Sequence, residues 1–500
     1  MAGGLAAGGG IVVGQALTNA LHARATPIQS FAEVVIAKTP GSLAEALIHL
    51  VGRNDKPILV DGTIVVTVLL GVLAGVLSGR RLWPGMLLFA VMGAIAFAAT
   101  IGHGVGGGSG SGLVDVLPVA GGVVTWFVVL SLLVEAARPP TVARADAALS
   151  RRAFMLKAGG VALGALVVGV GGQFLGRSRR TVEAARARLR LPITQQSPPA
   201  GAQGGLPGLT SWQVPNTTFY RIDTALVLPA VDPDEWQLRI HGMVDQEMRL
   251  SFADLIGRRI TQAWVTLCCV SNPVGGPLIG NAWWSGVRIA DLLHEAGVHP
   301  AATAVKQTSA DGWTCGTPIQ ALTDGRNAML AVGMNGKPLP IEHGFPVRMI
   351  VPGLYGYVSA CKWLVDLEVT TFRAFSAYWT QRGWSPRGPV KTESRIEVPG
   401  GFTTVPAGTV RVGGHAWAQH TGIAKVEYRL DGAPWRDAEL GRVPSVDTWV
   451  QWVGMVQVPN GRHTLAVRAT DKSGYTQTAV RHGVIPNGAT GWHTVQFTAS

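Results

Sequence analysis

Two separate stretches of the chain carry residue types that can hold a soft metal and an anionic organic cofactor together. Residues 266–269 read Thr-Leu-Cys-Cys, and residues 343–348 read His-Gly-Phe-Pro-Val-Arg. A thiolate selects soft or high-valent metals. An Arg fork binds phosphate through two parallel hydrogen bonds, and a His supplies a further donor. Cys269, His343 and Arg348 are therefore the first candidates for a metal and cofactor site.

A third stretch, residues 352–363, adds features of an anion site. Backbone N–H groups around Gly353 and Gly356 can form an anion nest, next to the hydroxyl of Ser359 and the point charge of Lys362. Taken singly, such residues have plainer explanations. A free Cys is usually a small buried hydrophobe, a lone Lys is usually a solvated surface charge, and a His in a turn is usually structural.

Together these stretches resemble the catalytic domain of the sulfite oxidase family, and the resemblance covers about residues 215–490. In that family the metal-ligating Cys follows a Thr-Leu-x-Cys strand and precedes a small residue and an Asn, here Asn272. The resemblance implies that Cys269 ligates molybdenum held by a pterin dithiolene, for oxygen-atom transfer between Mo(VI) and Mo(IV). Cys268 is expected to point to the opposite face of an extended strand.

The resemblance also implies roles for other side chains. Tyr378 lies near the position of the family's active-site Tyr, so it is a second catalytic candidate. The residues expected to bind the molybdopterin are Phe219, Tyr220, Arg221, Asp311, His343, Arg348, Gly353, Gly356, Ser359 and Lys362.

The substrate side departs from the family pattern. Ile222 stands where the family has Arg, Thr224 where it has His, and Pro273 where it has a second Arg. Sulfite is a small dianion whose binding needs forked cations. Arg221 and Arg382 are candidates to replace them. Both sulfite oxidation and the reduction of a sulfoxide or N-oxide therefore stay open.

These candidates fall on short strands and helices of a predicted α+β domain, residues 211–380. Residues 236–243 alternate like a half-buried strand, and residues 251–256 read as a short capped helix. A strand at 265–269 runs into Cys269, and a turn and helix follow at 283–293. Such mixing of strands and helices is typical of an α+β fold.

The N-terminal part is predicted to be a multi-span α-helical membrane region. A bilayer needs roughly 20 apolar residues per helix. Basic residues at 80–81 and 138–152 mark cytoplasmic flanks and predict an extracytoplasmic catalytic domain on a multi-pass cell-membrane protein. The candidate spans are residues 4–21, 57–79, 83–104, 113–136 and 154–176, the first weakened by Gly and polar residues.

Residues 150–157 resemble the twin-arginine export motif, an address read by the export machinery. An ordinary positive cytoplasmic flank is the alternative. We therefore expect four spans in residues 1–150, the motif and a fifth helix in 151–178, and a linker in 179–210, whose second half is flexible by composition.

Residues 381–500 alternate with a period of two, and turn signals recur along them, which predicts an all-β immunoglobulin-like sandwich. In the family such a domain dimerises. A homodimer and a monomer with a packing domain are both open.

Charge and cysteine content exclude other classes of protein. The net charge of +12 gathers beside apolar segments, without the basic and aromatic stripe of a nucleic-acid binder. The apolar segments also lack the paired charges of a transporter. Four Cys residues make no disulfide framework, and pairing of Cys315 with Cys361 is open.

The sequence therefore predicts a membrane-tethered, extracytoplasmic molybdenum-pterin oxidoreductase acting on a small S- or N-containing molecule. Its electrons must go to or come from a quinone-linked or cytochrome partner. His22 and His103 would also permit a haem within the membrane region. The alternative is a metal-free, membrane-anchored binding or sensor protein that keeps the fold without catalysis.

Overall fold

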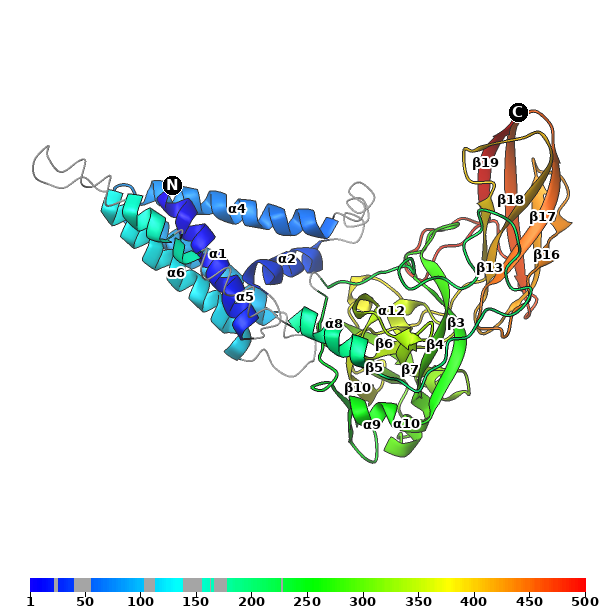
Figure 1. Cartoon of the computed structure of the whole chain (residues 1–500), viewed down its shortest axis with the longest axis horizontal. Helices are drawn as coiled ribbons and strands as arrows, with labels where there is room; N and C mark the ends of the chain where they lie inside the picture. Colours follow the sequence, from blue (N-terminus) through cyan, green and yellow to red (C-terminus); the bar gives the residue numbers. More distant parts are fainter. Residues whose placement is uncertain are drawn as a thin grey trace, which may run out of the picture. The chain divides into compact units, whose positions relative to one another are not determined.

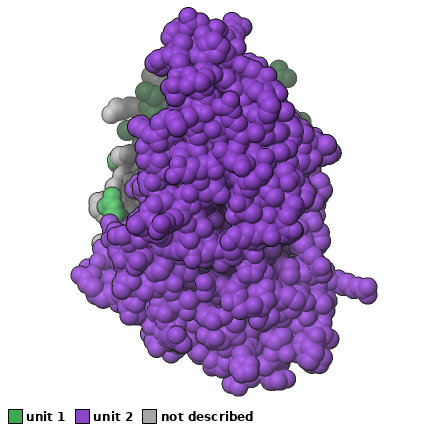
Figure 2. Space-filling model, turned by 90° about the vertical axis from the view of Figure 1, so that its right-hand side faces the viewer, with its two compact units in different colours: residues 1–181, 225–228 green, residues 182–224, 229–500 purple. Residues whose placement is uncertain are grey.

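The structure is a computed structural model that falls into two units. It describes residues 1–21, 26–39, 55–102, 113–137, 155–161, 163–165, 178–225 and 228–500. Unit 1 comprises residues 1–181 and 225–228, and unit 2 comprises residues 182–224 and 229–500; Figure 2 colours them separately.

Unit 1 is helical (Figure 1), as the apolar stretches predict. Three of its helices are long and apolar enough to cross a membrane, at Ile58–Leu77, Trp83–Ile101 and Asp115–Ala137. They correspond to the second, third and fourth predicted spans, and many of their outward side chains are apolar. The described helices are α1 (Ala2–Ala20), α2 (Pro27–Lys38), α4 (Asp55–Leu77), α5 (Trp83–Gly102) and α6 (Leu113–Ala137).

Helix α1 differs from the other predicted spans. It is too rich in Gly and polar residues to count among the long apolar helices. Its glycines instead let backbones approach closely, since Gly3 lies against Gly71 of α4 and Gly10 against Gly122 of α6. Small residues therefore place α1 against its neighbours.

Part of the predicted fifth span lies outside the described residues. Met155–Ala165 is a shorter apolar helix. The arginines of the twin-arginine motif, Arg151 and Arg152, also lie outside the described residues, as do His22 and His103.

The first part of unit 2 is an α+β domain with two sheets (Figure 1). One has the order β2-β1-β10-β5-β6, with β1 parallel to β10. The other has the order β3-β4-β7-β8, and β9 also pairs with β7. The strands are β1 (Gln237–Gly242), β2 (Met248–Ser251), β3 (Ile260–Cys268), β4 (Ile279–Arg288), β5 (Ala304–Ser309), β6 (Thr314–Pro318), β7 (Met329–Met334), β8 (Lys337–Pro338), β9 (Arg348–Ile350) and β10 (Leu364–Thr370).

Short helices connect these strands where the sequence supplies caps. Ser251 caps α9 by accepting a hydrogen bond from the Asp254 amide, as the sequence predicts. Helix α10 ends at Gly297, whose φ of 68° suits glycine. The helices are α8 (Ser178–Arg188), α9 (Phe252–Ile256), α10 (Ile289–Ala296), α11 (Gln320–Thr323) and α12 (Gly356–Ser359), with 3-10 turns at Ile341–His343 and Thr380–Arg382.

The C-terminal part of unit 2 is mostly β, as predicted. Its two sheets have the orders β11-β13-β17-β16 and β12-β19-β18-β14-β15. Val412 and Trp452 of the first sheet share an apolar core with Val467 and Phe497 of the second. The strands are β11 (Glu393–Val398), β12 (Thr404–Val405), β13 (Gly408–Trp417), β14 (Ile423–Leu430), β15 (Arg436–Asp437), β16 (Glu439–Leu440), β17 (Val450–Val458), β18 (Gly461–Asp471) and β19 (His493–Ala499).

The predicted flexible linker is instead bound along unit 2. The Thr194 amide donates to Gln262 Oε1 at 2.9 Å in the α+β part, and the Gly204 amide donates to Gln451 Oε1 at 2.5 Å in the β part. Leu206 is buried. A Gly- and Pro-rich composition predicts flexibility only where the backbone has no hydrogen-bond partner. Here the side chains of two distant glutamines supply such partners. We call residues 189–212 the strap.

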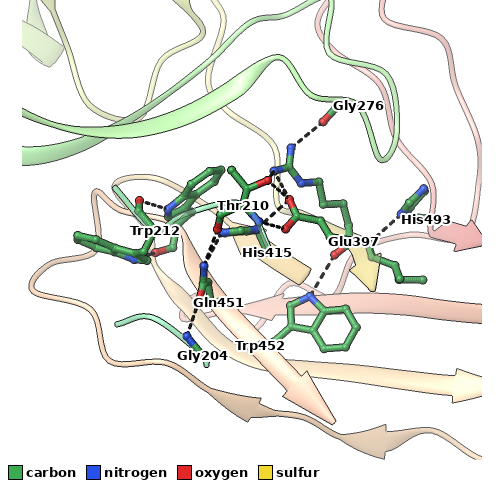
Figure 3. Close-up of polar contacts among 12 residues, drawn as sticks. Gly204, Thr210, Trp212, Gly276, Glu397, His415, Gln451, Trp452 and His493 are labelled. Carbon is green, nitrogen blue, oxygen red and sulfur yellow. Dashed lines mark hydrogen bonds and ion pairs between the residues drawn. The ribbon is translucent and has the colours of Figure 1, made fainter. Parts of the chain in front are cut away.

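A buried polar cluster joins the two parts of unit 2 (Figure 3). Arg395 donates to the Gly276 carbonyl at 3.0 Å and forms an ion pair with Glu397. Gln451 Nε2 donates to the Thr210 carbonyl at 2.8 Å. Although burial disfavours its charged form, the neighbouring His415 and Arg395 lower the pKa of Glu397. Because Gly276 lies in the loop after Cys269, this cluster holds that loop.

Candidate active site

A pocket of about 860 Å³, counting space that is open to solvent, lies in unit 2. Its walls come from segments far apart in the sequence, which the two sheets of the α+β part bring together. These segments lie within residues 219–224, 267–271, 309–313, 343–348, 356–363 and 379–384.

Cys269 lies where strand β3 ends and contributes to the pocket wall. Its amide donates to the Leu278 carbonyl at 2.9 Å, and its carbonyl accepts from the Asn272 amide at 3.1 Å, so the backbone on both sides is fixed. Burial raises the pKa of the Cys269 thiol, and hydrogen bonds from Ser271 partly offset this. Cys268 is buried and lies outside the pocket wall, as strand alternation predicts.

Arg348 is a buried cation whose described contacts include no carboxylate. Its guanidinium donates to the carbonyl oxygens of His343 at 3.1 Å and Ala360 at 3.3 Å, and it lies 5.2 Å from the ring centre of Trp284. Its Nε has no hydrogen-bond partner among the described residues. Burial lowers its pKa to about 10. A buried guanidinium without a carboxylate partner destabilises the protein unless an anion binds to it. The pocket therefore suits a ligand with an anionic group.

His343 is neutral and fixed in orientation. Burial lowers its pKa to about 4, although the Asn216 carbonyl partly opposes this. Its Nε2 lies 2.9 Å from that carbonyl oxygen, which only accepts, so Nε2 carries the proton. The ring of Phe219 meets it edge-on at 5.7 Å.

Lys362 and Arg221 share one carboxylate, Asp223. The Lys362 ammonium lies 3.0 Å and Arg221 Nε 3.3 Å from Asp223 Oδ2. Burial lowers the pKa of Lys362 to about 8, while Asp223 acts to raise it. The sequence does not by itself predict a role for Asp223. Its position between Ile222 and Thr224, two expected substrate positions, was the one signal that could have indicated it.

Most predicted site residues line this pocket. Phe219 stacks on Tyr220 at 5.3 Å, and burial, then Cys269, raises the pKa of Tyr220. Gly356 begins α12 at the wall. The predicted residues found in the wall are Phe219, Tyr220, Arg221, Cys269, Asp311, His343, Arg348, Gly356 and Lys362.

Three predicted residues lie outside the pocket wall in the described part of the chain. The Ser359 hydroxyl donates to carbonyls of the preceding turn at 3.0 and 2.9 Å. Gly353, with φ of 83°, fits closely against His420. The ring of Tyr378 lies 3.6 Å from the Arg382 guanidinium carbon. Its neighbour Trp379 reaches the pocket instead.

The four cysteines are free thiols. Cys315 and Cys361 are both fully buried. Their side chains contact each other, since burial, followed by a side-chain hydrogen bond with Cys315, raises the pKa of the Cys361 thiol.

Comparison with known proteins identifies the pocket-bearing region. A family model described as "Oxidoreductase molybdopterin binding domain" matches residues 225–379. Rat mitochondrial sulfite oxidase is 31% identical over 46% of this chain and 50% of its own length. The human enzyme is 30% identical over 51% and 54%. This chain thus spans about half the length of these relatives.

Two further matches support the assignment. The "Uncharacterized oxidoreductase YuiH" of Bacillus subtilis (strain 168) is 34% identical, and the match covers 34% of this chain and 83% of that protein. The crystal structure of the sulfane dehydrogenase SoxCD from Paracoccus pantotrophus shares the fold, with a TM-score of 0.50 and 22% identity over 60% of this chain and 87% of that one.

The cofactor that these relatives imply fits the residues present. A thiol side chain faces the same pocket as a buried Arg that lacks a carboxylate partner, so a metal-bearing anionic pterin satisfies both. The protein is thus an enzyme with a molybdenum-molybdopterin cofactor. By its sequence and by the fold that carries this pocket, the chain belongs to the sulfite oxidase family of molybdopterin-dependent oxidoreductases.

Proposed function

We propose that the protein is a membrane-tethered, extracytoplasmic oxidoreductase that moves an oxygen atom to or from a small S- or N-containing substrate. The observation that carries this proposal is the pocket itself, where Cys269 and the carboxylate-free Arg348 face one space. When bound, the molybdenum cofactor supplies a two-electron centre for oxygen-atom transfer.

The side chains of the pocket divide the work of holding that cofactor. Cys269 is the metal ligand. Arg348 supplies a bidentate fork and Lys362 a point charge for the phosphate. Neutral His343 and the turn at Gly356 meet polar edges of the pterin.

The remaining residues exclude water or hold the backbone. The aromatic rings of Phe219 and Tyr220 cover the inner wall, while Asp311 accepts from the Trp313 amide at 3.0 Å and shapes a turn beside it. Gly353, Ser359 and Tyr378 support the loops of the pocket from outside it.

The membrane placement rests on unit 1 and on the charge pattern. Three long apolar helices, the shorter apolar helix of the fifth predicted span and the basic flanks support a multi-pass anchor, with the catalytic domain outside the cytoplasm. The motif at 150–157 supports export by the twin-arginine machinery. The domains are then 1–150, 151–178, 179–210, 211–380 and 381–500.

Two partners complete the proposal. Electrons pass between this protein and a quinone-linked or cytochrome partner in or at the membrane. The two packed sheets of residues 381–500 support an immunoglobulin-like sandwich, and homodimerisation through it is the arrangement we propose.

Metal content is the test of this function. We expect molybdenum stoichiometric with the purified full chain, together with released pterin. Cys269→Ser should lower bound molybdenum, whereas the matched control Cys268→Ser, whose side chain lies outside the pocket wall, should keep it. Exported, folded wild-type protein without metal and pterin would favour the metal-free binding protein instead.

A further inference from the structure

With the cofactor phosphate bound, the charges that line the pocket leave no net positive charge for an anionic substrate. Within the described part of the chain, the positively charged residues of the wall are Arg221, Arg348 and Lys362. Asp223 pairs with both Arg221 and Lys362, so its single negative charge offsets one of their two positive charges. In the proposed function Arg348 and Lys362 also bind the cofactor phosphate, and His343 is neutral near pH 7. The cofactor phosphate carries close to two negative charges and balances the two positive charges that remain, so a second anion would meet no net positive charge from these groups.

The side chains at the expected substrate positions are uncharged. Ile222 and Thr224 line the pocket. Ile222 is 47% exposed, so the pocket is open to solvent at this residue. Pro273 packs against Gly276, outside the pocket wall. Arg382 donates to the Tyr378 carbonyl at 2.7 Å and also lies outside the wall, so it does not replace the missing cations.

Aromatic rings form another part of the pocket wall. Trp379 and Trp384 meet edge to face with centroids 6.2 Å apart, and Tyr357 lies 5.9 Å from Trp384. The Tyr357 hydroxyl donates to the Ser385 carbonyl at 2.7 Å, so the polar end of this side chain is already satisfied. Such a wall offers ring faces and edges, which bind apolar and aromatic groups well.

We propose that the pocket takes an uncharged organic oxide, a sulfoxide or N-oxide with an aromatic or alkyl group, and disfavours inorganic oxyanions. Ile222, Trp379 and Trp384 are the specificity-determining residues. This inference rests on the proposed function and names its substrate class.

The reaction balances with the partner already named. In the reductive direction the S–O or N–O bond breaks, and the sulfur or nitrogen keeps the bonding pair. The oxygen leaves as water with two protons from solvent. A quinol or reduced cytochrome supplies the two electrons.

The test compares matched substrates on the purified full chain with its molybdenum content measured. Methyl phenyl sulfoxide is the neutral probe, and the same molecule with a ring carboxylate is the anionic probe. Both are reduced with electrochemically reduced methyl viologen. We expect kcat/KM for the neutral probe to exceed that of the anionic probe by at least about tenfold, since one mismatched group at a binding site has that effect.

Two variants test the residues. Trp379→Leu should lower kcat/KM for methyl phenyl sulfoxide roughly tenfold, mostly through KM, and should affect dimethyl sulfoxide less. Ile222→Arg should narrow or reverse the preference for the neutral probe. Trp435→Leu is the matched control, because Trp435 packs under Arg429 and Arg468 in the C-terminal β part, outside the pocket.

Each other outcome contradicts the inference. A Mo-loaded enzyme that prefers the anionic probe, oxidises sulfite faster than it reduces any sulfoxide, or reduces no probe overturns the substrate class but leaves the cofactor and family intact. Equal effects of Trp379→Leu on both neutral sulfoxides remove Trp379 as a determinant. Protein without molybdenum overturns the proposed function and this inference together.

Discussion

Two buried arginines in unit 2 have opposite surroundings. Arg395 forms an ion pair with Glu397, and that carboxylate also lies 3.2 Å from His415. Arg348, equally buried, donates only to carbonyl oxygens among the described residues, whereas both arginines leave Nε without a hydrogen-bond partner there. The charge of Arg395 is balanced by a carboxylate, and the pair holds structure. The charge of Arg348 is balanced only with an added anion, which distinguishes a binding site from a structural ion pair.

The largest expected effect comes from breaking the ion pair between Arg395 and Glu397. Arg395→Met should lower the free energy of unfolding by roughly 3–5 kcal/mol, because Glu397 would keep a buried charge without its main cation. Urea unfolding of the full chain in detergent measures this loss. The double variant with Glu397→Leu should recover much of it, and a variant as stable as wild type would contradict the structural role.

Two of the buried histidines, His343 and His415, sharpen the comparison through pH. His343 faces a carbonyl, and burial lowers its pKa to about 4, from an ordinary value of 6.5. The unfolded chain therefore binds a proton that the folded chain resists, so stability falls as pH drops from 6.5 to 4. The full effect is about 3 kcal/mol.

His343→Gln should flatten that acid limb in pH-dependent urea unfolding. His415 is also buried, and its pKa is lowered as well, but Glu397 acts to raise it. A His343 variant with an unchanged acid limb would show that the limb has another origin.

Removing Arg348, the arginine without a carboxylate partner, should leave the fold intact but weaken binding of the cofactor. Arg348→Met should reduce retained pterin and molybdenum by roughly 10–100-fold, the usual effect of losing an outer contact to a metal site. The unfolding midpoint of cofactor-free protein should stay or rise, because an uncompensated buried cation is gone. A strong loss of apo stability would place Arg348 with Arg395 as a structural residue.

The smallest expected effect concerns Asp223, whose single carboxylate pairs with both Arg221 and Lys362. Asp223→Asn frees positive charge at the pocket and should raise kcat/KM for an anionic substrate such as sulfite roughly tenfold. Steady-state kinetics at low and high salt check this, since salt should weaken the gain. An unchanged salt response would mean that these cations do not act on the substrate.

Sequence alone predicts those residues that a local pattern fixes. Strand alternation separates Cys269 from Cys268, and the short motifs lead to His343, Arg348 and Lys362. The α+β class, the β-rich C-terminal part and three apolar helices follow from hydrophobic periodicity in the same way.

Features that depend on distant partners are not predictable locally. Asp223 and Lys362 meet across 139 residues, and nothing in either segment announces the other. Tyr378 and Trp379 lie in an irregular loop after β10, where no period decides which side chain faces the pocket, and the wall receives Trp379. The strap has the composition of a linker because its binding groups, Gln262 and Gln451, lie elsewhere.

The strap also has a consequence for the order in which the protein is completed. Gly204 is synthesised before the whole catalytic domain, yet it binds Gln451 of β17, which is synthesised after that domain. Contacts between residues so far apart in sequence form late and slowly. Unit 2 therefore cannot close from one end while the chain is being made. The contact between the strap and β17 therefore forms only after every segment that lines the pocket has been made.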